Sequence, residues 1–375
     1  MALDLGNIRQ EIDKIDDEML ALFQKRMECS KQVAEYKVEH GLSVLNATRE
    51  QQILDDIASK AGDNATRTEL LFSTIMNISR GAQYPLVTKQ SPVRDIIKSA
   101  LNLPFSPQKI GFQGTNGSYS QMALKKLFPT ADDISFTHFE DVFKAVHDGK
   151  INAGVLPCEN SYAGTISENF DLLLKYDLKI NAMTDLTVNH CLLVKKGADL
   201  SKIKTVYSHR QALSQCAEYI TEHGFEPVAM ENTAFAAKYV AESNDCTIAA
   251  IASESTAELY GLEIAKVGVQ SAKQNFTRFM TVSRNLTANT DADLVSIAFS
   301  LPHTAGSLYK MLSMLASAGL NMTRIESRPD KESPFRYVFY VDFEGNIKDE
   351  TVASMLCGLY DELPMMKILG NCKII

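Results

Sequence analysis

The sequence of 375 residues lacks long apolar runs, and no stretch of eighteen consecutive apolar residues occurs in it. We therefore expect no membrane-spanning helix and no membrane partner. The first residues, Met1 to Leu5, also lack a basic region followed by an apolar stretch, which predicts that no secretory signal is present. These absences together indicate a cytoplasmic protein.

Cysteines and histidines are few and widely spaced. The seven cysteines form no C-x-x-C pair, and the seven histidines show no H-x-x-x-H or H-E-x-x-H spacing. This usage favours reduced cytosolic thiols over disulfides or a zinc site, and we expect neither a metal nor a cofactor. A net charge of −8 also argues against nucleic acid as a partner, because such binding needs a basic surface.

Three blocks of different character follow one another along the chain, and the length itself favours two or three domains. In residues 1–84, apolar side chains recur at the three-and-four spacing of amphipathic helices, and Gly41 offers a stop. We predict an all-α domain there, with helices over 7–40, 47–60 and 67–84.

The middle of the chain differs in character from this helical block. Residues 85–108 hold four prolines among polar residues, which predicts a linker with a short helix near 93–101. In residues 109–285, short apolar runs alternate with helical stretches. This alternation is typical of an α/β domain with largely parallel, buried strands.

After a polar break at 285–292, the last block, 293–375, follows the order strand, helix, strand, strand, helix, strand. This order is the ferredoxin-like pattern, so we predict a third domain of the α+β class. The expected strands are 294–300, 321–327, 336–343 and 365–372, and the expected helices are 305–318 and 348–362.

Basic residues on the first predicted helix suggest a shared anion site. Arg26 and Lys37 lie eleven residues apart, about three turns, and so project from one face. Arg9 lies about 25 Å further back along the axis and cannot share a small ligand with Lys37. If all three serve one pocket, Arg9 must come from a partner chain. A rod of this length cannot bury its apolar stripe within one short block, so we expect a homodimer or a higher homo-oligomer.

These basic residues belong to a larger set that resembles the all-helical chorismate mutases at the expected spacings. The set consists of Arg9, Arg26, Lys37, Asn46, Arg49, Glu50, Ser79 and Gln83. Asn46 stands where that family usually has Asp, and we expect this to change affinity without abolishing activity. The alternative is that these residues are solvated charges on a helical surface.

The resemblance implies an intertwined dimer that binds chorismate and rearranges it to prephenate without a nucleophile or a cofactor. The enzyme holds the substrate in a reactive shape and stabilises charge on the ether oxygen. The implied roles are carboxylate binding for Arg9, Arg26 and Arg49, donation to the ether oxygen for Lys37 and Gln83, contact with the ring hydroxyl for Asn46 and Glu50, and a lesser contact for Ser79.

In the middle block, Gly111-x-x-Gly114-x-x-Gly117 follows a predicted strand and precedes a predicted helix. The spacing is wrong for the G-x-G-x-x-G fingerprint and no acidic residue completes it, so we do not expect a nucleotide. A glycine-rich turn whose amides hold a carboxylate at the helix start is the alternative.

Several segments of this block resemble prephenate dehydratase. They are Gly111–Gly114, Gly117–Ser120, Pro157–Ser161, Asn189–Leu193, Tyr207–His209, Gln215–Cys216 and Asn275–Phe279. Within the last of them, Thr277-Arg278-Phe279 matches the catalytic signature of that family. The family fold is a pair of α/β lobes around a cleft, similar to the type II periplasmic-binding arrangement.

The resemblance implies that Thr277 donates a hydrogen bond to the leaving hydroxyl of prephenate. The expected prephenate-binding residues are Asn160, Ser161, Thr165, Ser208, Gln215, Thr277 and Arg278. For Arg278 an ion pair within the protein is the favoured alternative. His190 and His209 are expected to be core or surface residues.

The last block contains two motifs that resemble the ACT regulatory domain of the same enzymes. Their residues are Ala305, Gly306, Ser307, Leu308, Glu326, Ser327, Arg328 and Pro329. The resemblance implies a site for L-phenylalanine between two subunits, and end-product inhibition through a shift in population. The alternative is a plain dimerisation module.

Through these resemblances the chain is identified as a member of the bifunctional chorismate mutase/prephenate dehydratases. Such enzymes of L-phenylalanine biosynthesis turn chorismate into prephenate, and prephenate into phenylpyruvate with loss of CO₂ and water. Two other interpretations stay open. One is a prephenate or arogenate dehydratase with a weak or vestigial mutase domain, and the other is a small-solute binding protein of the same two-lobed fold.

Overall fold

The computed structural model describes residues 4–101, 105–271, 275–330 and 333–375. The chain divides into two compact units. The first unit comprises residues 1–100 and 295–368, and the second comprises residues 101–294 and 369–375. Within the described residues, no helix combines the length and the apolar character needed to cross a membrane.

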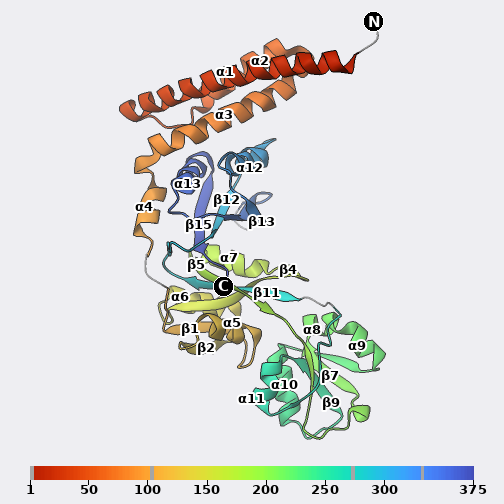
Figure 1. The fold of residues 1–375 in the computed structure, drawn as a ribbon. Helices are drawn as coiled ribbons and strands as arrows, with labels where there is room; N and C mark the ends of the chain where they lie inside the picture. The colour runs from red at the N-terminus through yellow and green to blue at the C-terminus, as the bar shows by residue number, and fades with distance from the viewer. Residues whose placement is uncertain (1–3, 102–104, 272–274, 331–332) are drawn as a thin grey trace. The chain divides into compact units, whose positions relative to one another are not determined.

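Long helices form the N-terminal part of the first unit, and they are seen side by side in Figure 1. They are α1 (Leu5–His40), α2 (Ala47–Ala61) and α3 (Ala65–Val87), and they are followed by α4 (Pro92–Ser99). Short 3₁₀ turns, η1 (Gly62–Asn64) and η2 (Thr88–Gln90), flank α3. α3 packs against both α1 and α2. The three predicted long helices and the short fourth helix are confirmed.

α1 begins and ends at residues whose chemistry caps a helix. The carboxylate of Asp4 accepts a hydrogen bond from the N–H of Gly6 at 2.9 Å. Gly41 has a φ of 63°, the left-handed conformation that glycine adopts most easily. The N–H of the next residue, Leu42, then closes onto the Lys37 carbonyl at 2.9 Å. The predicted stop at Gly41 is confirmed.

α3 runs to Val87, past the predicted end at residue 84, and includes Pro85. The predicted linker therefore starts too early, at 85. A proline gives no N–H to the helix ladder and its ring crowds the carbonyl four residues earlier, so it disrupts least near a helix end, and α3 ends two residues after Pro85. Part of the predicted linker, 102–104, lies outside the described residues.

The first half of α1 leaves its apolar side chains exposed. The five residues at the three-and-four spacing, from Ile8 to Leu22, are 41–64% exposed. The buried residues of α1, Ser30 and Ala34, lie in its second half, where α3 packs. Among the described residues of one chain, therefore, nothing covers the apolar stripe in the N-terminal half of α1.

The C-terminal part of the first unit has the predicted order of strands and helices. Its elements are β12 (Leu294–Ser300), α12 (Ser307–Ser317), β13 (Met322–Pro329), β14 (Tyr337–Glu344), α13 (Glu350–Glu362) and β15 (Met365–Cys372). The strands lie in the order β13-β14-β12-β15, with β13 and β14 antiparallel. This arrangement is ferredoxin-like, as predicted.

α3 also packs against α12 and α13, so it joins the two parts of the first unit. Tyr84 is only 1% exposed, and its ring lies against Gly358 of α13. A Cβ on Gly358 would lie 2.6 Å from a ring carbon of Tyr84, so only glycine allows this approach. Asn77 adds a hydrogen bond from its Nδ2 to the Lys310 carbonyl of α12 at 2.9 Å.

The second unit consists of two α/β lobes. The first lobe has strands in the order β5-β11-β3-β1-β2, with β4 paired to β3. Its strands are β1 (Lys109–Gln113), β2 (Asp132–Phe136), β3 (Ala153–Asn160), β4 (Gly164–Thr165), β5 (Lys179–Thr187) and β11 (Phe276–Ser283). Its helices are α5 (Tyr119–Leu127), α6 (Phe139–His147) and α7 (Ser167–Lys175).

The second lobe is built from the segment between β5 and β11, and its strands lie in the order β10-β6-β9-β7-β8. They are β6 (Cys191–Val194), β7 (Thr205–His209), β8 (Glu226–Met230), β9 (Ile248–Ala252) and β10 (Glu263–Val267). Its helices are η3 (Leu200–Lys202), α8 (Arg210–Gln215), α9 (Ala217–Glu222), α10 (Thr233–Glu242) and α11 (Glu254–Tyr260).

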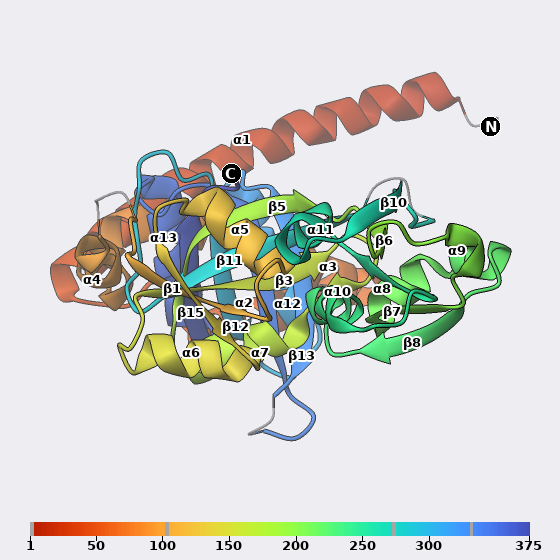
Figure 2. The ribbon, with the colours of Figure 1, turned by 90° about the horizontal axis from the view of Figure 1, so that it is seen from below.

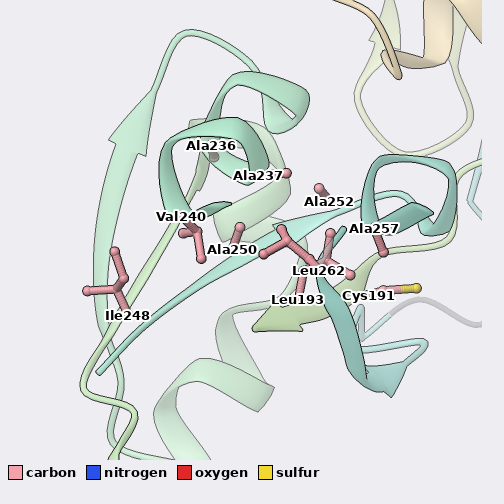
Figure 3. Close-up of a cluster of buried hydrophobic side chains, with 10 residues drawn as sticks. All are labelled: Cys191, Leu193, Ala236, Ala237, Val240, Ile248, Ala250, Ala252, Ala257 and Leu262. Atoms are coloured by element: carbon pink, nitrogen blue, oxygen red, sulfur yellow. The ribbon is translucent and has the colours of Figure 1, made fainter. Parts of the chain in front are cut away.

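The sheet of the second lobe is covered on both faces, which explains its continuous apolar runs. Ile248, Ala250 and Ala252 of β9 pack with side chains of α10 and α11 (Figure 3). The alternate residues Ala249 and Ile251 pack on the other face, with side chains of α8 and α9. Figure 2 shows helices α8 to α11 around these strands.

The strands of the second unit are mixed in direction, so the prediction of largely parallel strands is wrong. β1 is parallel to β2 and β3, and β7 is parallel to β8 and β9. β11 is antiparallel to both β3 and β5. The reason is topological: the chain leaves the first lobe through β5 and returns through β11, so these neighbours run in opposite directions.

We predict that Gly358→Ala lowers the free energy of unfolding of the first unit by about 1–2 kcal/mol, because the added Cβ would overlap the Tyr84 ring. Gly81→Ala, in the facing helix α3, is the matched control. Its Cβ would meet only Ser317 Oγ at 3.8 Å, so the higher helix propensity of Ala should raise stability by about 0.5–1 kcal/mol. Urea unfolding followed by circular dichroism measures both, and a shift of the same sign for both variants would contradict this packing.

Two candidate active sites

The first unit contains a cavity of about 310 Å³ lined by α1, α2 and α3, here called the helical cavity. Most of the predicted chorismate-binding residues line it, namely Arg26, Lys37, Asn46, Arg49, Glu50, Ser79 and Gln83. Arg9 does not. It is exposed near the start of α1, about five turns before Arg26.

Lys37 and Gln83 hold each other in place across the helical cavity. Lys37 Nζ donates to Gln83 Oε1 at 2.9 Å and to the Val44 carbonyl at 2.5 Å. Gln83 Nε2 in turn donates to Ser30 Oγ at 3.0 Å. An ammonium has three N–H groups and an amide has two, so each side chain keeps one donor for a ligand.

The charges around the helical cavity are set by burial and by one carboxylate. Burial lowers the pKa of Lys37 and of Arg26, and in both cases the nearby Glu50 carboxylate opposes the shift. The guanidinium of Arg80 lowers the pKa of Lys37 further. The lining of the helical cavity has four basic side chains, Arg26, Lys37, Arg49 and Arg80, and one carboxylate, Glu50, which suits a ligand with two negative charges.

Of the three arginines predicted to bind carboxylates, the two that line the helical cavity differ in how they are held. Arg26 donates to Ser79 Oγ and, at 3.5 Å, to the Ile75 carbonyl. The guanidinium of Arg49 has no hydrogen-bond or ion-pair partner among the described residues. Arg49 is therefore available to an anionic ligand, whereas Arg26 is already oriented by the protein.

Asn46 is the N-cap of α2, and its Oδ1 accepts the N–H of Arg49 at 3.0 Å. Only the Nδ2 group of Asn46 is then left for a ligand. Asp caps a helix equally well, but its second carboxylate oxygen would be left to accept a hydrogen bond from a ligand. The replacement of the usual Asp by Asn thus preserves the helix start and exchanges an acceptor for a donor at the cavity.

Arg80 also lines the helical cavity, although the sequence analysis did not single it out. It donates to both carboxylate oxygens of Glu50, at 2.6 and 2.5 Å. No spacing in the sequence marks Arg80, because its carboxylate partners Glu50 and Glu362 lie 30 and 282 residues away.

The second unit contains a cavity of about 380 Å³ lined by both of its lobes, here called the interlobe cavity. Three lining residues end strands that have a parallel neighbour: Gln113 ends β1, Asn160 ends β3 and His209 ends β7. Open α/β sheets bind ligands at this edge, outside the carboxyl ends of the strands. The predicted residues Asn160, Gln215 and Thr277 all line this cavity.

Thr277 is held by a chain of amide hydrogen bonds. Its Oγ1 accepts from Asn160 Nδ2 at 2.9 Å, and no described residue accepts its own O–H. Asn160 Nδ2 also donates to Asn275 Oδ1 at 2.8 Å, and Asn275 Nδ2 donates to Gln215 Oε1 at 3.0 Å. The chain spans both lobes and leaves the Thr277 hydroxyl able to donate to a ligand.

His190 extends this chain. It is buried, as expected for a core histidine, and it also lines the interlobe cavity. It is 2% exposed, and its Nε2 lies 2.9 Å from Gln215 Oε1. An amide oxygen only accepts, so Nε2 carries a proton. Burial lowers the pKa of His190, which favours the neutral ring with this proton on Nε2.

Some predicted prephenate residues do not line the interlobe cavity. They are Ser161, Thr165, Ser208 and Arg278. Ser208 is fully buried and donates to the Ile251 carbonyl at 2.5 Å. Ser161 Oγ accepts the N–H of Phe276 at 2.9 Å, and Thr165 pairs with Glu159 in the β3–β4 turn.

Arg278 forms the ion pair that the sequence analysis favoured. Its Nε and Nη2 each donate to an oxygen of Asp185 at 2.8 Å, on the neighbouring strand β5. Side chains alternate along a strand, so Arg278 faces away from the cavity that Thr277 and Phe279 line.

The structure adds cavity residues that were not among the predicted prephenate-binding residues, although five of them lie in the segments that resemble prephenate dehydratase. They are Gln113, Ser118, Tyr119, His190, His209, Gln211, Glu231 and Asn232. One signal could have found several of them, because Gln113 and His209 end strands and Glu231 and Asn232 directly follow β8. Burial and the neighbouring Arg210 lower the pKa of His209.

The glycine-rich turn leads into α5 at the wall of the interlobe cavity. Gly114 and Gly117 have φ of 114° and 84°, which other residues rarely adopt. Ser118 caps α5 by accepting the N–H of Gln121 at 3.4 Å. The N–H groups of Tyr119 and Ser120 have no acceptor among the described residues, so the helix start can hold a carboxylate.

No group of three His, Cys, Asp or Glu side chains gathers as metal ligands anywhere in the described parts of the chain. The cysteines are joined by no disulfide.

Comparison with known proteins relates each cavity to a protein family. Family models match the chain as chorismate mutase type II over residues 8–84 and as prephenate dehydratase over residues 110–287. The chain is 30% identical to the bifunctional chorismate mutase/prephenate dehydratase of Pseudomonas aeruginosa, over 98% of this chain and 97% of the relative. The chain belongs to the bifunctional chorismate mutase/prephenate dehydratase family.

Other relatives align with part of the chain. It is 36% identical to arogenate dehydratase/prephenate dehydratase 2 of Arabidopsis thaliana, over 77% of this chain and 78% of the relative. The crystal structure of prephenate dehydratase from Arthrobacter aurescens in complex with L-Phe shares 29% identity and a TM-score of 0.65, over 70% of this chain and 89% of that chain. In this bifunctional family member, the helical cavity falls inside the mutase match and the interlobe cavity inside the dehydratase match.

We predict that Asn46→Ala lowers the free energy of unfolding of the first unit by about 1 kcal/mol, because it removes the N-cap of α2. Asn46→Asp, which keeps the cap and restores the usual residue of the mutases, should change it by less than about 0.5 kcal/mol. Thermal unfolding of the full chain, followed at a helix-sensitive wavelength, compares the two. Equal stability of the Ala and Asp variants would contradict the capping role.

Proposed function

We propose that this chain rearranges chorismate to prephenate in the helical cavity and converts prephenate to phenylpyruvate, with loss of CO₂ and water, in the interlobe cavity. The observation that carries the proposal is that most of the predicted mutase residues line one cavity of the chain, while Asn160, Gln215 and Thr277 of the predicted dehydratase residues line another. The match to a bifunctional relative along nearly the whole chain supports it.

The mutase reaction is concerted and needs no nucleophile, so the helical cavity acts by positioning and charge. Arg26 and Arg49 bind the carboxylates of chorismate. Lys37 and Gln83 donate their remaining N–H groups to the ether oxygen, where negative charge develops. Lys37 does so only while protonated, so we expect activity to fall as the pH rises through its lowered pKa.

Glu50 and Asn46 contact the ring hydroxyl of chorismate in this proposal. Glu50 accepts from it, and Asn46 contributes its unengaged Nδ2 group. Their different hydrogen-bonding roles suit a hydroxyl, which both donates and accepts. Ser79 acts mainly through Arg26, because its hydroxyl already accepts a hydrogen bond from that guanidinium.

Arg9 serves the site of a second copy of the chain. Its exposed position on α1 and the exposed apolar stripe from Ile8 to Leu22 support an intertwined homodimer. A second copy packed along this stripe would bury the apolar side chains and bring its own Arg9 towards the helical cavity of the first. A cytoplasmic location belongs to this proposal as well, supported by the cysteines that form no disulfides.

In the dehydratase reaction, the ring hydroxyl and the carboxylate of prephenate leave as the ring becomes aromatic. Thr277 donates its O–H to the leaving hydroxyl and is oriented by Asn160. Gln215 offers its Nε2 group to the substrate, since its Oε1 is occupied by Asn275 and His190. The N–H groups at the start of α5 bind the pyruvyl carboxylate.

Neutral donors suit this step, because a cation beside the departing carboxylate would hold it back. Thr277, Asn160 and Gln215 are all neutral, and Arg278, the cation adjacent in sequence, is turned away to Asp185. Phe279 supplies an apolar wall that keeps the leaving CO₂ poorly solvated.

L-Phenylalanine is the proposed effector, and the C-terminal part of the first unit is its site. α12 follows Gly306 with no side-chain cap. The N–H of Ser307 already donates to the Thr304 carbonyl at 3.3 Å, but the next two N–H groups have no acceptor among the described residues and are open to an amino-acid carboxylate. The relative from Arthrobacter aurescens, a prephenate dehydratase, is in complex with L-Phe. The proposed contacts remain Ala305, Gly306, Ser307, Leu308, Glu326, Ser327, Arg328 and Pro329.

We predict that Thr277→Ala lowers phenylpyruvate formation by at least about 100-fold and leaves chorismate consumption unchanged, because one donor to the leaving group is lost. Arg26→Ala should do the reverse, slowing chorismate consumption by about 100-fold while added prephenate is still dehydrated. Each variant is the control of the other in a chromatographic assay of both steps. Loss of both activities in either variant would contradict two separate sites.

We predict that Gly306→Ala raises the L-phenylalanine concentration for half-inhibition of the dehydratase by about tenfold or more, because the added Cβ would take up space that the bound amino acid needs at the helix start. Gly319→Ala, just past the other end of α12, is the matched control, since both glycines have positive φ (80° and 69°) and open space around them. Equal sensitivity of the two variants in an inhibition titration would place the effector site elsewhere.

A further inference from the structure

A buried guanidinium connects the helical cavity to the C-terminal part of the first unit. Arg80 of α3 is 6% exposed and lies between two carboxylates, Glu50 of α2 and Glu362 at the end of α13. Its Nη1 donates to both oxygens of Glu50, at 2.6 and 2.5 Å. Its Nε and Nη2 donate to the two oxygens of Glu362, at 2.7 and 3.1 Å.

The remaining N–H of Arg80 is also used. Nη2 donates to Asn77 Oδ1 at 2.5 Å, which brings the number of occupied N–H groups to all five that a guanidinium has. Arg80 therefore has no donor left for a substrate, even though it lines the helical cavity. Its function has to be exerted through the groups that it holds.

Glu362 is itself fixed by the C-terminal part of the unit and by α3. Tyr84 donates its O–H to Glu362 Oε1 at 2.5 Å, and the ring of Tyr84 packs against Gly358, one turn before Glu362 on α13. The side chain of Glu362 is only 12% exposed. A shift of α13 would therefore move Glu362, and Arg80 would have to follow or lose two hydrogen bonds in a buried place.

We propose that Arg80 is a positioning residue for the mutase reaction and that Glu362, outside the mutase helices, completes it by fixing the guanidinium that orients Glu50. This inference rests on the proposed function of the helical cavity. It makes the geometry of the chorismate hydroxyl contact depend on the position of α13. The mutase site thus includes a residue of the C-terminal part of the chain.

The charges favour this role over a purely structural one. A buried arginine shared by two carboxylates leaves Glu50 with only part of the guanidinium, so its oxygens keep capacity to accept from a substrate hydroxyl. Without the charge of Glu362, Arg80 would turn fully to Glu50. The carboxylate of Glu50 would then be a weaker acceptor for a substrate hydroxyl, and the orientation of Arg80 would no longer be fixed by carboxylates on two sides.

The test is a comparison of full-length Glu362→Gln with the matched control Glu350→Gln. Glu350 lies on the same helix and also pairs with an arginine, Arg94 of α4, at 2.5 Å, but neither residue lines the helical cavity. We expect E362Q to lower the kcat/KM for chorismate by about tenfold or more, with a higher KM as part of the loss. We expect E350Q to match wild type, and the dehydratase rate on added prephenate to be the same in all three proteins.

Two further results decide between positioning and loss of fold. In a double-mutant cycle, R80K with E362Q should lose no more mutase activity than R80K alone, because lysine cannot hold both carboxylates. Additive losses in the double variant would overturn the inference. So would an E362Q variant with a lower kcat and an unchanged KM, because that result signals a smaller fraction of correctly folded, active protein. If E362Q also loses dehydratase activity, its fold is damaged and a milder variant is needed. Tyr84→Phe removes only the hydrogen bond to Glu362, and it must still raise the KM for chorismate.

The assay separates this inference from the proposed function. Wild-type protein that leaves chorismate untouched would overturn the proposed mutase activity and this inference with it. If wild-type protein turns over chorismate and E362Q has the same kcat/KM for chorismate as E350Q, the inference is overturned and the proposed mutase activity stands.

Discussion

The buried ion triad of Glu50, Arg80 and Glu362 is the interaction on which the first unit depends most. A guanidinium out of water is costly unless every N–H finds an acceptor, and Arg80 meets this condition with two carboxylates and one amide oxygen. Those acceptors come from α2, α3 and α13. The requirement to satisfy one buried charge therefore fixes α3 against elements that are far apart in sequence, and α3 also carries Ser79 and Gln83 into the helical cavity.

A second constraint shapes the other unit. Sheets covered on both faces must be apolar along their whole length, so polar side chains gather where the strands end. The interlobe cavity follows from this, because Gln113, Asn160 and His209 each end a strand. Its chemistry depends on neutral amides that satisfy one another, and the result is a Thr277 hydroxyl with its proton available to a ligand.

Much of this organisation could be predicted from the sequence, because local signals determine it. Apolar spacing and the cap at Gly41 predicted the helices of residues 1–84 to within a few residues, and the order of strand-like and helix-like segments predicted the strands of the last block. Residues tied to a motif, such as Lys37, Gln83 and Thr277, line the two cavities, but no observation tests their roles.

The rest depended on contacts that no local pattern encodes. Ser208 and Arg278 have the right chemistry for a substrate, but Ser208 donates to the Ile251 carbonyl and Arg278 pairs with Asp185, and both partners lie on other strands. His190 enters the interlobe cavity through a bond to Gln215, and Arg80 depends on a partner 282 residues away. Strand directions were misjudged for the same reason, since they follow from the return of the chain through β11.

The most direct test of two active sites in one chain supplies chorismate as the sole substrate to the purified full-length protein. Chorismate, prephenate and phenylpyruvate are then followed together over time. We predict that chorismate disappears, prephenate rises and falls or stays low, and phenylpyruvate accumulates. Chorismate that stays untouched while added prephenate is dehydrated would contradict the mutase site, and failure of both compounds to react would contradict the enzymatic function altogether.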